Sequence, residues 1–357
     1  TMKKIRFLAL LCAAALIITL FAGCGSSSAF ETKPEETKTS QTAEPAETEV
    51  EPEYEVTLNV AHVQSDGDNV AQAYALALKE ACKKYGIKIE IFPGAQLGDS
   101  AALVEGVQMG TIDINITGTA DYGKLYAPLG VLDLAYIWKD YDQMAGVLNG
   151  EVGTELAKGL LDAAGVRILA YSVSFGYRCV GTVGEKNAFT NLDEAKALNL
   201  KIRTIESDVY INTMQAMGLN PTPMGFGEVY TSLQTHVIDG YEHDCNTSLA
   251  NAFDEVIDHY MLTKHMCGPM GLFMSEISFQ KLTEEQQKNL LAAAAEASAA
   301  HTAMAPEKEA VSLAEMESSG VDIVEVDVDS FAKAVKEFNI KYCEEKGWTD
   351  VYNKIVG

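Results

Sequence analysis

Hydrophobic positions change their spacing several times after Tyr54. Runs in which apolar residues alternate with polar ones, or follow one another directly, predict strands. Between these runs, apolar residues recur every three to four positions, which predicts helices. The first five segments are a strand at 55–63, a helix at 68–86, a strand at 87–93, a helix at 99–110 and a strand at 111–116.

Residues that start or stop secondary structure stand where the pattern changes. Gly86 ends the first helix, and Pro93 stops the strand after it. Asp99 or Ser100 caps the second helix, and Gly110 lies just past its end. These residues support the boundaries that the periodicity predicts.

The same alternation continues in the second half of the chain. Strands are predicted at 166–173 and 200–205, and a short helix at 191–198 lies between them. Strands that alternate with helices favour an α/β fold with largely parallel or mixed sheets.

Two segments, 103–118 and 229–244, share one plan. In each, a helix carries a Gln, and five residues later an Asp (Asp113 or Asp239) lies in a short buried strand. Chance gives such a pattern, and so does any β–α unit. If the pattern is a repeat, the chain has two similar lobes whose strand ends face a common crevice, where open α/β sheets bind ligands.

The longest helical stretch is 279–319. Thr283 with Gln286 forms a capping box, and the Ala-rich interior favours a helix. Pro306 is expected to kink or divide it. A helix this long exceeds what one lobe needs, so we expect it to run along both.

Residues 1–23 have the pattern of a secretory signal peptide. Basic residues precede an apolar run from Phe7 to Phe21, and small residues follow. The run is too short to span a bilayer comfortably, although an uncleaved N-terminal anchor is the alternative. The sequence LFAGC resembles a bacterial lipobox, in which Cys24 becomes the lipidated N-terminus and holds the protein to a membrane surface.

Residues 25–53, which follow the lipidated Cys24, are rich in Ser, Thr, Glu and Pro and predict a disordered tether. The folded part therefore starts near Tyr54. The formal net charge of −24 excludes nucleic-acid binding by phosphate neutralisation and charge-driven binding to anionic lipid.

Cysteine and histidine positions favour neither a disulfide framework nor a metal site. Five cysteines follow the tether, an odd number without C-x-x-C spacing. Segment 241–246, with His259, His265 and Cys267, has metal-binding residue types at a spacing that fits no common site. The chain also lacks nucleotide-binding and hydrolase motifs, so we expect no metal and no cofactor.

Arginine is rare in this chain. Lysine and arginine together number 27, and only four are arginines: Arg6, Arg167, Arg178 and Arg203. Arg203 lies in the predicted strand 200–205. A planar guanidinium matches a carboxylate with two parallel hydrogen bonds, which lysine cannot do. Arg203 is therefore a candidate carboxylate-binding residue.

Several motifs follow one another between residues 200 and 244. They are a K-x-R strand at 201–203, a P-T-P segment at 221–223, an E-x-Y-x-x-L-Q helix at 228–234 and a D-G strand start at 239–240. This order resembles TRAP-transporter solute-binding proteins, the DctP-type extracytoplasmic receptors. Similar motifs at 92–99, 107–113 and 126–137 extend the resemblance over nearly all of 54–357.

The resemblance implies a periplasmic-binding-protein-like α/β fold with two α/β lobes around a ligand cleft and a long helix spanning both. Lobe I would comprise 54–174 plus about 269–308, and lobe II 175–268 plus about 309–357. The resemblance implies a receptor rather than an enzyme. Such a receptor binds a small organic acid and delivers it to the small and large TRAP membrane subunits, which an ion gradient drives. Most relatives act as monomers.

The resemblance also assigns ligand-binding residues. The family's binding arginine maps onto Arg203, and a second arginine maps onto Arg178, at a longer spacing than usual. His243 stands where relatives commonly carry Asn, and we expect binding to weaken as pH rises through its titration. Phe226 matches an aromatic that some relatives place against the ligand; a core position is the alternative. The remaining candidates at the cleft are Gln64, Ser65 and Tyr122.

Two other functions remain open at this point. A surface lipoprotein enzyme acting on organic acids would need a nucleophile with a base in reach, and the sequence offers no such pair. An ABC-type receptor shares the fold class, but the E-x-Y-x-x-L-Q motif and the long helix favour the TRAP type. The expected location is the outer face of the cell membrane, or the periplasm if the cell has two membranes. The ligand is equally open among C4-dicarboxylates, sugar acids, 2-oxo or hydroxy acids and aromatic acids.

Overall fold

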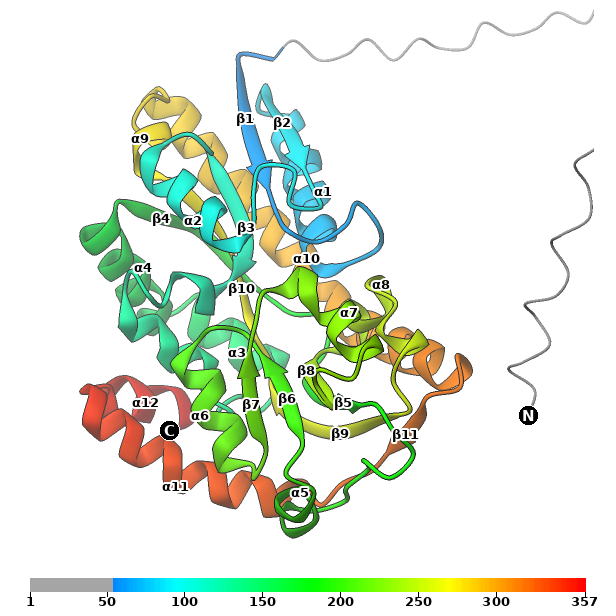
Figure 1. Ribbon diagram of the computed structural model, residues 1–357. Helices are drawn as coiled ribbons and strands as arrows, with labels where there is room; N and C mark the ends of the chain where they lie inside the picture. The colour runs from blue at the N-terminus through cyan, green and yellow to red at the C-terminus, as the bar shows by residue number, and fades with distance from the viewer. Residues whose placement is uncertain (1–53) are drawn as a thin grey trace, which may run out of the picture. The chain divides into compact units, whose positions relative to one another are not determined.

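The computed structural model describes residues 54–357 (Figure 1). The signal peptide predicted at 1–23, Cys24 and the tether lie outside the described residues. No helix within 54–357 combines the length and the apolar character needed to cross a membrane.

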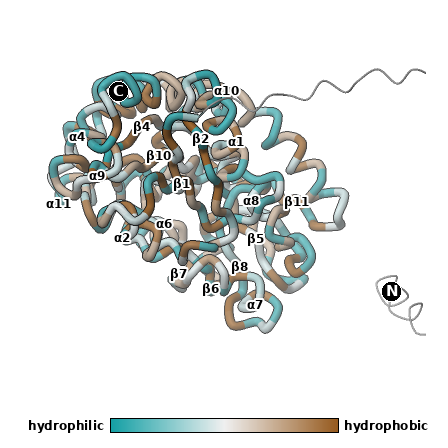
Figure 2. The backbone as a smooth tube through the Cα atoms, turned by 90° about the horizontal axis from the view of Figure 1, so that it is seen from above, coloured by the Kyte–Doolittle hydropathy of each residue, from teal (hydrophilic) through white to brown (hydrophobic). Residues whose placement is uncertain are grey.

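The first lobe is built on a five-stranded sheet in the order β2-β1-β3-β10-β4. β1 pairs in parallel with β2 and β3, whereas β10 runs antiparallel between β3 and β4. Hydrophobic residues dominate these strands, as Figure 2 shows for β1 and β10. The strands are β1 Val56–Ala61, β2 Ile87–Phe92, β3 Ile114–Gly118, β4 Val166–Val173 and β10 Pro269–Ser275. Its helices are α1 Val70–Lys83, α2 Ser100–Met109, η1 Thr119–Tyr122, η2 Ala127–Asp133, α3 Tyr141–Leu148, α4 Glu151–Ala164 and α9 Glu276–Phe279.

The second lobe is built on a six-stranded sheet in the order β11-β9-β5-β8-β6-β7. β6 pairs in parallel with β7 and β8, and β5 runs antiparallel to β8 and β9. The strands are β5 Arg178–Thr182, β6 Lys201–Thr204, β7 Asn220–Pro223, β8 Gly240–His243, β9 His259–Met266 and β11 Asp322–Val324. Its helices are α5 Leu192–Leu198, α6 Asp208–Ala216, η3 Phe226–Glu228, α7 Val229–Gln234, α8 Cys245–Ala250, η4 Phe253–Glu255 and α11 Val328–Lys346.

Local capping chemistry sets the helix ends that the sequence predicts. Asp99 caps α2 by accepting from the backbone N–H of Ala102, and Gly110 ends that helix with φ 73°. The cap of α1 differs from the expected start at Asp68: the side chain of Asn69 accepts from the N–H of Gln72. The α/β architecture predicted from the alternating pattern is confirmed.

Asp113 and Asp239 hold equivalent places in the two lobes. Asp113 directly precedes β3, and its Oδ2 accepts from the backbone N–H of Asn59 in β1 at 2.9 Å. Asp239 directly precedes β8, and its Oδ2 accepts from the backbone N–H of Lys201 in β6 at 2.8 Å. Each carboxylate thus joins the start of one strand to its parallel neighbour. The shared plan seen in the sequence is therefore a shared structure, although each Asp lies just before its strand instead of within it.

The long helix α10, Glu284–Ser318, contacts both lobes. It packs on α1 and β4 of the first lobe and on α8 of the second. Thr283 and Gln286 form the predicted capping box. Pro306 does not divide the helix, contrary to that part of the expectation. Ala305 and Ser312, on either side of it, are both buried, so packing holds the helix together where one backbone bond is lost.

The strands of the first sheet all lie within 54–174 and 269–308, and those of the second within 175–268 and 309–357. The C-terminal helix α12, Thr349–Val356, departs from this division. Trp348, Tyr352 and Ile355 are buried in the core of the first lobe, and the Gln143 side chain donates to the carbonyl of Ile355 at 2.8 Å. The chain end that we assigned to lobe II therefore packs on lobe I.

Candidate functional site

Arg203 lies in β6 and is 2% exposed. Its Nε and Nη2 donate to the carbonyl of Met224 at 3.2 and 2.9 Å, and its guanidinium lies 5.8 Å from the centre of the Phe226 ring. Within residues 54–357, no carboxylate forms an ion pair with it. Burial lowers the pKa of Arg203 to about 10, because the cation loses water without gaining a counter-charge in contact.

Arg178, the first residue of β5, is already paired. Its Nε lies 2.5 Å from Oε2 of Glu242, its Nη2 lies 2.8 Å from Oε1, and Nη2 also donates to the Glu242 carbonyl at 2.9 Å. Burial alone would raise the pKa of Glu242, but Arg178 and His265 outweigh burial and lower it to about 2. The carboxylate is therefore ionised at neutral pH and neutralises Arg178.

The pairing of the strands separates these two arginines. Arg203 is opposite Tyr241, and Glu242 is opposite Val180. Successive side chains of a strand point to opposite faces of the sheet. Arg203 therefore leaves the sheet on the face of Tyr241, whereas Arg178 leaves with Val180 and Glu242 on the other face.

His243 and Phe226 lie with Arg203. The ring centres of His243 and Phe226 are 5.8 Å apart, and both side chains are half-buried. Nδ1 of His243 is 2.8 Å from Oδ2 of Asp244, which also caps α8 through the N–H of Thr247. Burial, with Arg178 nearby, lowers the pKa of His243 despite the Asp244 carboxylate. The structure thus brings together three of the residues predicted from the sequence.

Tyr122 lies in the core of the first lobe. Its side chain is fully buried, and its ring stacks on Phe273 with centres 3.9 Å apart. The side chain of Asn115 donates to its hydroxyl at 3.3 Å. The cleft-rim position expected from the sequence is therefore not where the structure places this residue.

Gln64 and Ser65 lie in the loop after β1 and are half-buried. The carbonyl of Gln64 accepts from the N–H of Gly94 at 2.6 Å, and the carbonyl of Ser65 accepts from the side chain of Asn69 at 2.9 Å. These bonds fix the loop itself. A role of the two side chains toward a ligand stays a prediction.

The loop after β3 contributes a residue that sequence reasoning missed. Asp121 is half-buried and accepts from the hydroxyl of Thr117. Burial raises its pKa, and the guanidinium groups of Arg203 and Arg178 oppose that rise. An ion pair between Lys124 and Glu206, 3.3 Å, joins this loop of the first lobe to the loop after β6. Polar residues directly after a predicted strand were the available signal.

Asp133 is a second carboxylate that sequence reasoning missed. It is 1% exposed, and burial raises its pKa to about 7. The hydroxyls of Thr119 and Tyr210 donate to it at 2.9 and 3.3 Å. Tyr210 belongs to α6 of the second lobe, and its ring centre lies 5.1 Å from the Arg178 guanidinium. Asp133 therefore links the two lobes beside the paired arginine.

A family model described as bacterial extracellular solute-binding protein, family 7 (DctP), matches residues 60–346. The chain belongs to this DctP family. The resemblance seen in the sequence is confirmed, and so is the two-lobed binding-protein fold with its long helix. Members of the DctP family are extracellular receptors for solutes.

Named relatives and solved structures agree with this membership. The chain is 31% identical over 273 residues to the 2,3-diketo-L-gulonate-binding periplasmic protein YiaO of Escherichia coli K12, which covers 76% of this chain and 81% of that protein. A TRAP periplasmic solute-binding protein from Polaromonas sp. JS666, bound to D-erythronate, superposes with a TM-score of 0.79 at 28% identity, covering 85% of this chain and 99% of that one. Another from Roseobacter denitrificans OCh 114, bound to L-galactonate, gives 0.78 at 27% identity with the same coverage.

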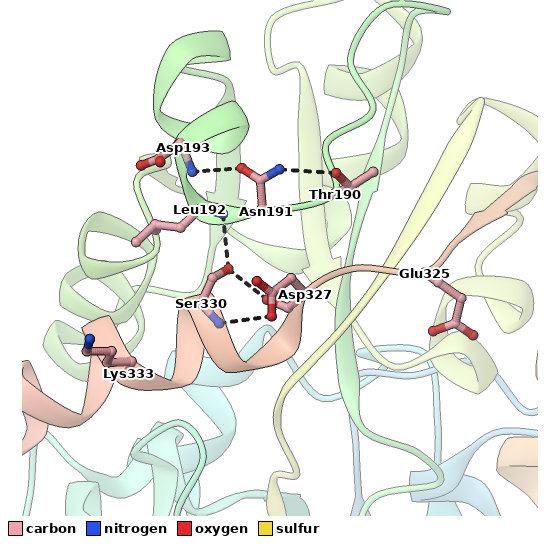
Figure 3. Close-up of a pocket in the computed structure, with 8 residues that line it drawn as sticks. All are labelled: Thr190, Asn191, Leu192, Asp193, Glu325, Asp327, Ser330 and Lys333. Carbon is pink, nitrogen blue, oxygen red and sulfur yellow. Dashed lines mark hydrogen bonds between the residues drawn. The ribbon is translucent and has the colours of Figure 1, made fainter.

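Two surface hollows of this DctP-family chain lie away from its arginines. The first, about 620 Å³, lies between the starts of α5 and α11, where Ser330 donates to Asp327 and accepts from the N–H of Leu192 (Figure 3). The second, about 890 Å³, lies between α3, α4, β4 and α10. Neither is lined by a residue predicted to bind ligand. The charged chemistry is therefore better located by the buried arginines than by these hollows.

The metal-binding residue types of segment 241–246 have other partners. Glu242 pairs with Arg178, and Asp244 caps α8. Within 54–357, His, Cys, Asp and Glu do not form any group of three or more that could hold a metal ion. All five cysteines of this part of the chain are buried and unpaired.

Proposed function

We propose that this DctP-family protein is the extracytoplasmic receptor of a TRAP transporter. It binds an organic acid through the acid's carboxylate and delivers it to the small and large membrane subunits, which an ion gradient drives. The observation that carries this proposal is the buried guanidinium of Arg203, which makes no ion pair within 54–357.

An unpaired buried cation is costly, because the charge has lost its hydration without compensation. A carboxylate that enters the site supplies the missing charge and accepts hydrogen bonds from the planar guanidinium. The energy that folding spends on exposing no counter-charge to Arg203 is thereby recovered on binding. Solute-binding proteins with similar folds carry D-erythronate and L-galactonate, both organic acids.

The acidity of the whole chain does not oppose this role. The formal net charge is −24, but charges farther than roughly 10 Å are largely screened at physiological salt. Arg203 acts at contact distance in a site that excludes water, where the dielectric is lower. The local attraction therefore outweighs the distant repulsion.

Phe226 and His243 would flank the bound acid beside Arg203, because the structure gathers them on one face of the sheet. Arg178 would act through its charge, since Glu242 already occupies Nε and Nη2. Gln64 and Ser65 would approach from the first lobe.

We also propose that Cys24 carries a lipid that holds the receptor to the outer face of the cell membrane, or within the periplasm of a cell with two membranes. The receptor acts as a monomer and catalyses no reaction.

A thermal-shift screen of the purified protein against organic acids tests the binding role. A ligand at 100 times its Kd stabilises the folded state by roughly 2.7 kcal/mol, which moves the midpoint visibly. We expect a carboxylate to shift the wild type and the Arg203→Ala variant to stay unmoved. Arg167→Ala is the matched control, because Arg167 pairs with Glu276 at 2.8 Å in the first lobe, outside the site. Equal shifts in all three proteins would refute Arg203 as the anchor.

A further inference from the structure

The balance of charge around Arg203 limits the charge of the ligand; this step rests on the proposed function. Arg178 and Glu242 form a two-bond pair that neutralises itself. Arg203 is then the one buried arginine in 54–357 whose charge no carboxylate in contact cancels. The second lobe thus offers a single uncompensated positive charge.

The first lobe adds negative charge on the opposite side. Asp121 follows β3, is half-buried, and senses both Arg203 and Arg178 electrostatically. Lys124, the neighbouring cation, is paired with Glu206 at 3.3 Å and has 72% of its side chain exposed. It therefore lies at the rim, where water screens its charge, and does not offset Asp121 inside.

The histidines do not change this balance at neutral pH. Burial lowers the pKa of His243 and of His265 below their usual 6.5. Nδ1 of His243 is held by Asp244 at 2.8 Å, and Nδ1 of His265 lies 2.8 Å from the hydroxyl of Thr263. Both rings are neutral in the unliganded protein at neutral pH, so neither supplies a second cation.

From this arrangement we propose that the receptor takes a monocarboxylate carrying hydroxyl groups and rejects the dicarboxylate of the same carbon skeleton. Arg203 binds the one carboxylate. Asp121 accepts hydrogen bonds from hydroxyl groups of the ligand, since an ionised carboxylate has more acceptor sites than the Thr117 hydroxyl fills. A second ligand carboxylate would approach Asp121 without a cation to meet it.

Matched pairs of acids test this selectivity. D-Erythronate and meso-tartrate differ only in a terminal CH₂OH or carboxylate, and so do L-galactonate and galactarate. Titration calorimetry on the purified protein would compare such pairs across chains of four to six carbons. We expect the tightest ligand to be a monocarboxylate, with its dicarboxylate partner at least about 100-fold weaker.

Two variants connect the selectivity to the residues. Asp121→Asn removes one negative charge but keeps an acceptor for Thr117, and we expect it to narrow the gap between partners about tenfold or more. Asp162→Asn is the control, since Asp162 pairs with Lys158 on the exposed face of α4; it should leave the gap unchanged.

A dicarboxylate that binds as tightly as its partner, and still depends on Arg203, would overturn this inference while leaving the proposed function intact. A gap that Asp121→Asn leaves unchanged would likewise overturn it. If no acid of the panel binds, the proposed function fails and this inference with it.

Discussion

Arg178 and Glu242 meet inside the second lobe through two parallel hydrogen bonds, Nε to Oε2 at 2.5 Å and Nη2 to Oε1 at 2.8 Å. Their side chains are 8% and 0% exposed. The pair fixes β5 against β8 at the point where the chain enters the second lobe. It also takes most of the hydrogen-bonding capacity of an arginine that the family resemblance assigns to ligand binding.

Breaking this pair should destabilise the fold. Removing one partner of a buried ion pair leaves an uncompensated charge, which costs about 3–5 kcal/mol. We expect Arg178→Met and Glu242→Leu each to lower the free energy of unfolding by about this amount in urea titrations. The double variant should recover much of the loss, because no buried charge is left alone. Additive losses in the double variant would show that the two residues do not act as a pair.

The same substitution at Arg203 should behave differently. Arg203→Met removes a buried cation that has no ion pair, and the gain offsets the donor lost by the Met224 carbonyl. The free energy of unfolding without ligand should stay within about 1 kcal/mol of wild type. Affinity for the organic acid should fall by roughly 30-fold or more, as for a truncated buried charge pair. A large loss of stability with unchanged affinity would make Arg203 a structural residue.

Asp133 should make stability depend on pH in an uncommon direction. Its pKa is raised from 3.8 to about 7 in the folded protein, so the folded state holds more protons than the unfolded state between these values. This contribution therefore favours folding at low pH and is lost as pH rises toward 7, at no more than about 1.4 kcal/mol per pH unit. Asp133→Asn should remove that slope from the difference between variant and wild type in urea titrations at several pH values. Parallel pH profiles for the two proteins would contradict the prediction.

The effect of His243 on binding should appear only in acid. A protonated imidazole donates more strongly to a carboxylate, so affinity should rise as pH falls through the pKa of this residue. Burial places that pKa below 6.5. We expect calorimetric affinity to be flat between pH 6.5 and about 8 and to increase at lower pH. In His243→Asn the acid increase should be absent; an unchanged profile in that variant would assign the effect to another group.

Local patterns predicted much of the fold. The periodic segments became strands and helices near the expected residues, and Asp99 and Thr283 cap the helices they precede. Arg203 stood out because an arginine in a strand of a lysine-rich chain needs a partner for its fork. These inferences succeed because they depend on neighbours within a few residues in the sequence.

Features that depend on distant pairing were not accessible in this way. Glu242 meets Arg178 only because β5 and β8 pair, 64 residues apart in the sequence. Tyr122 is in the core because β10 brings Phe273 beneath it. Asp121 and Asp133 acquire their shifted pKa values from burial, which no local pattern encodes.

The place of β10 in the first sheet constrains the order in which the protein can fold. β10 lies between β3 and β4, and β4 has no other neighbour in that sheet. Nearly all strands of the second sheet precede β10 in the sequence, so the first lobe cannot complete its sheet until most of the second lobe has been made. Pairings this distant in sequence form slowly, because a long loop must close first. A chain exported through a membrane would therefore acquire its first lobe late, after more than two thirds of its length has emerged.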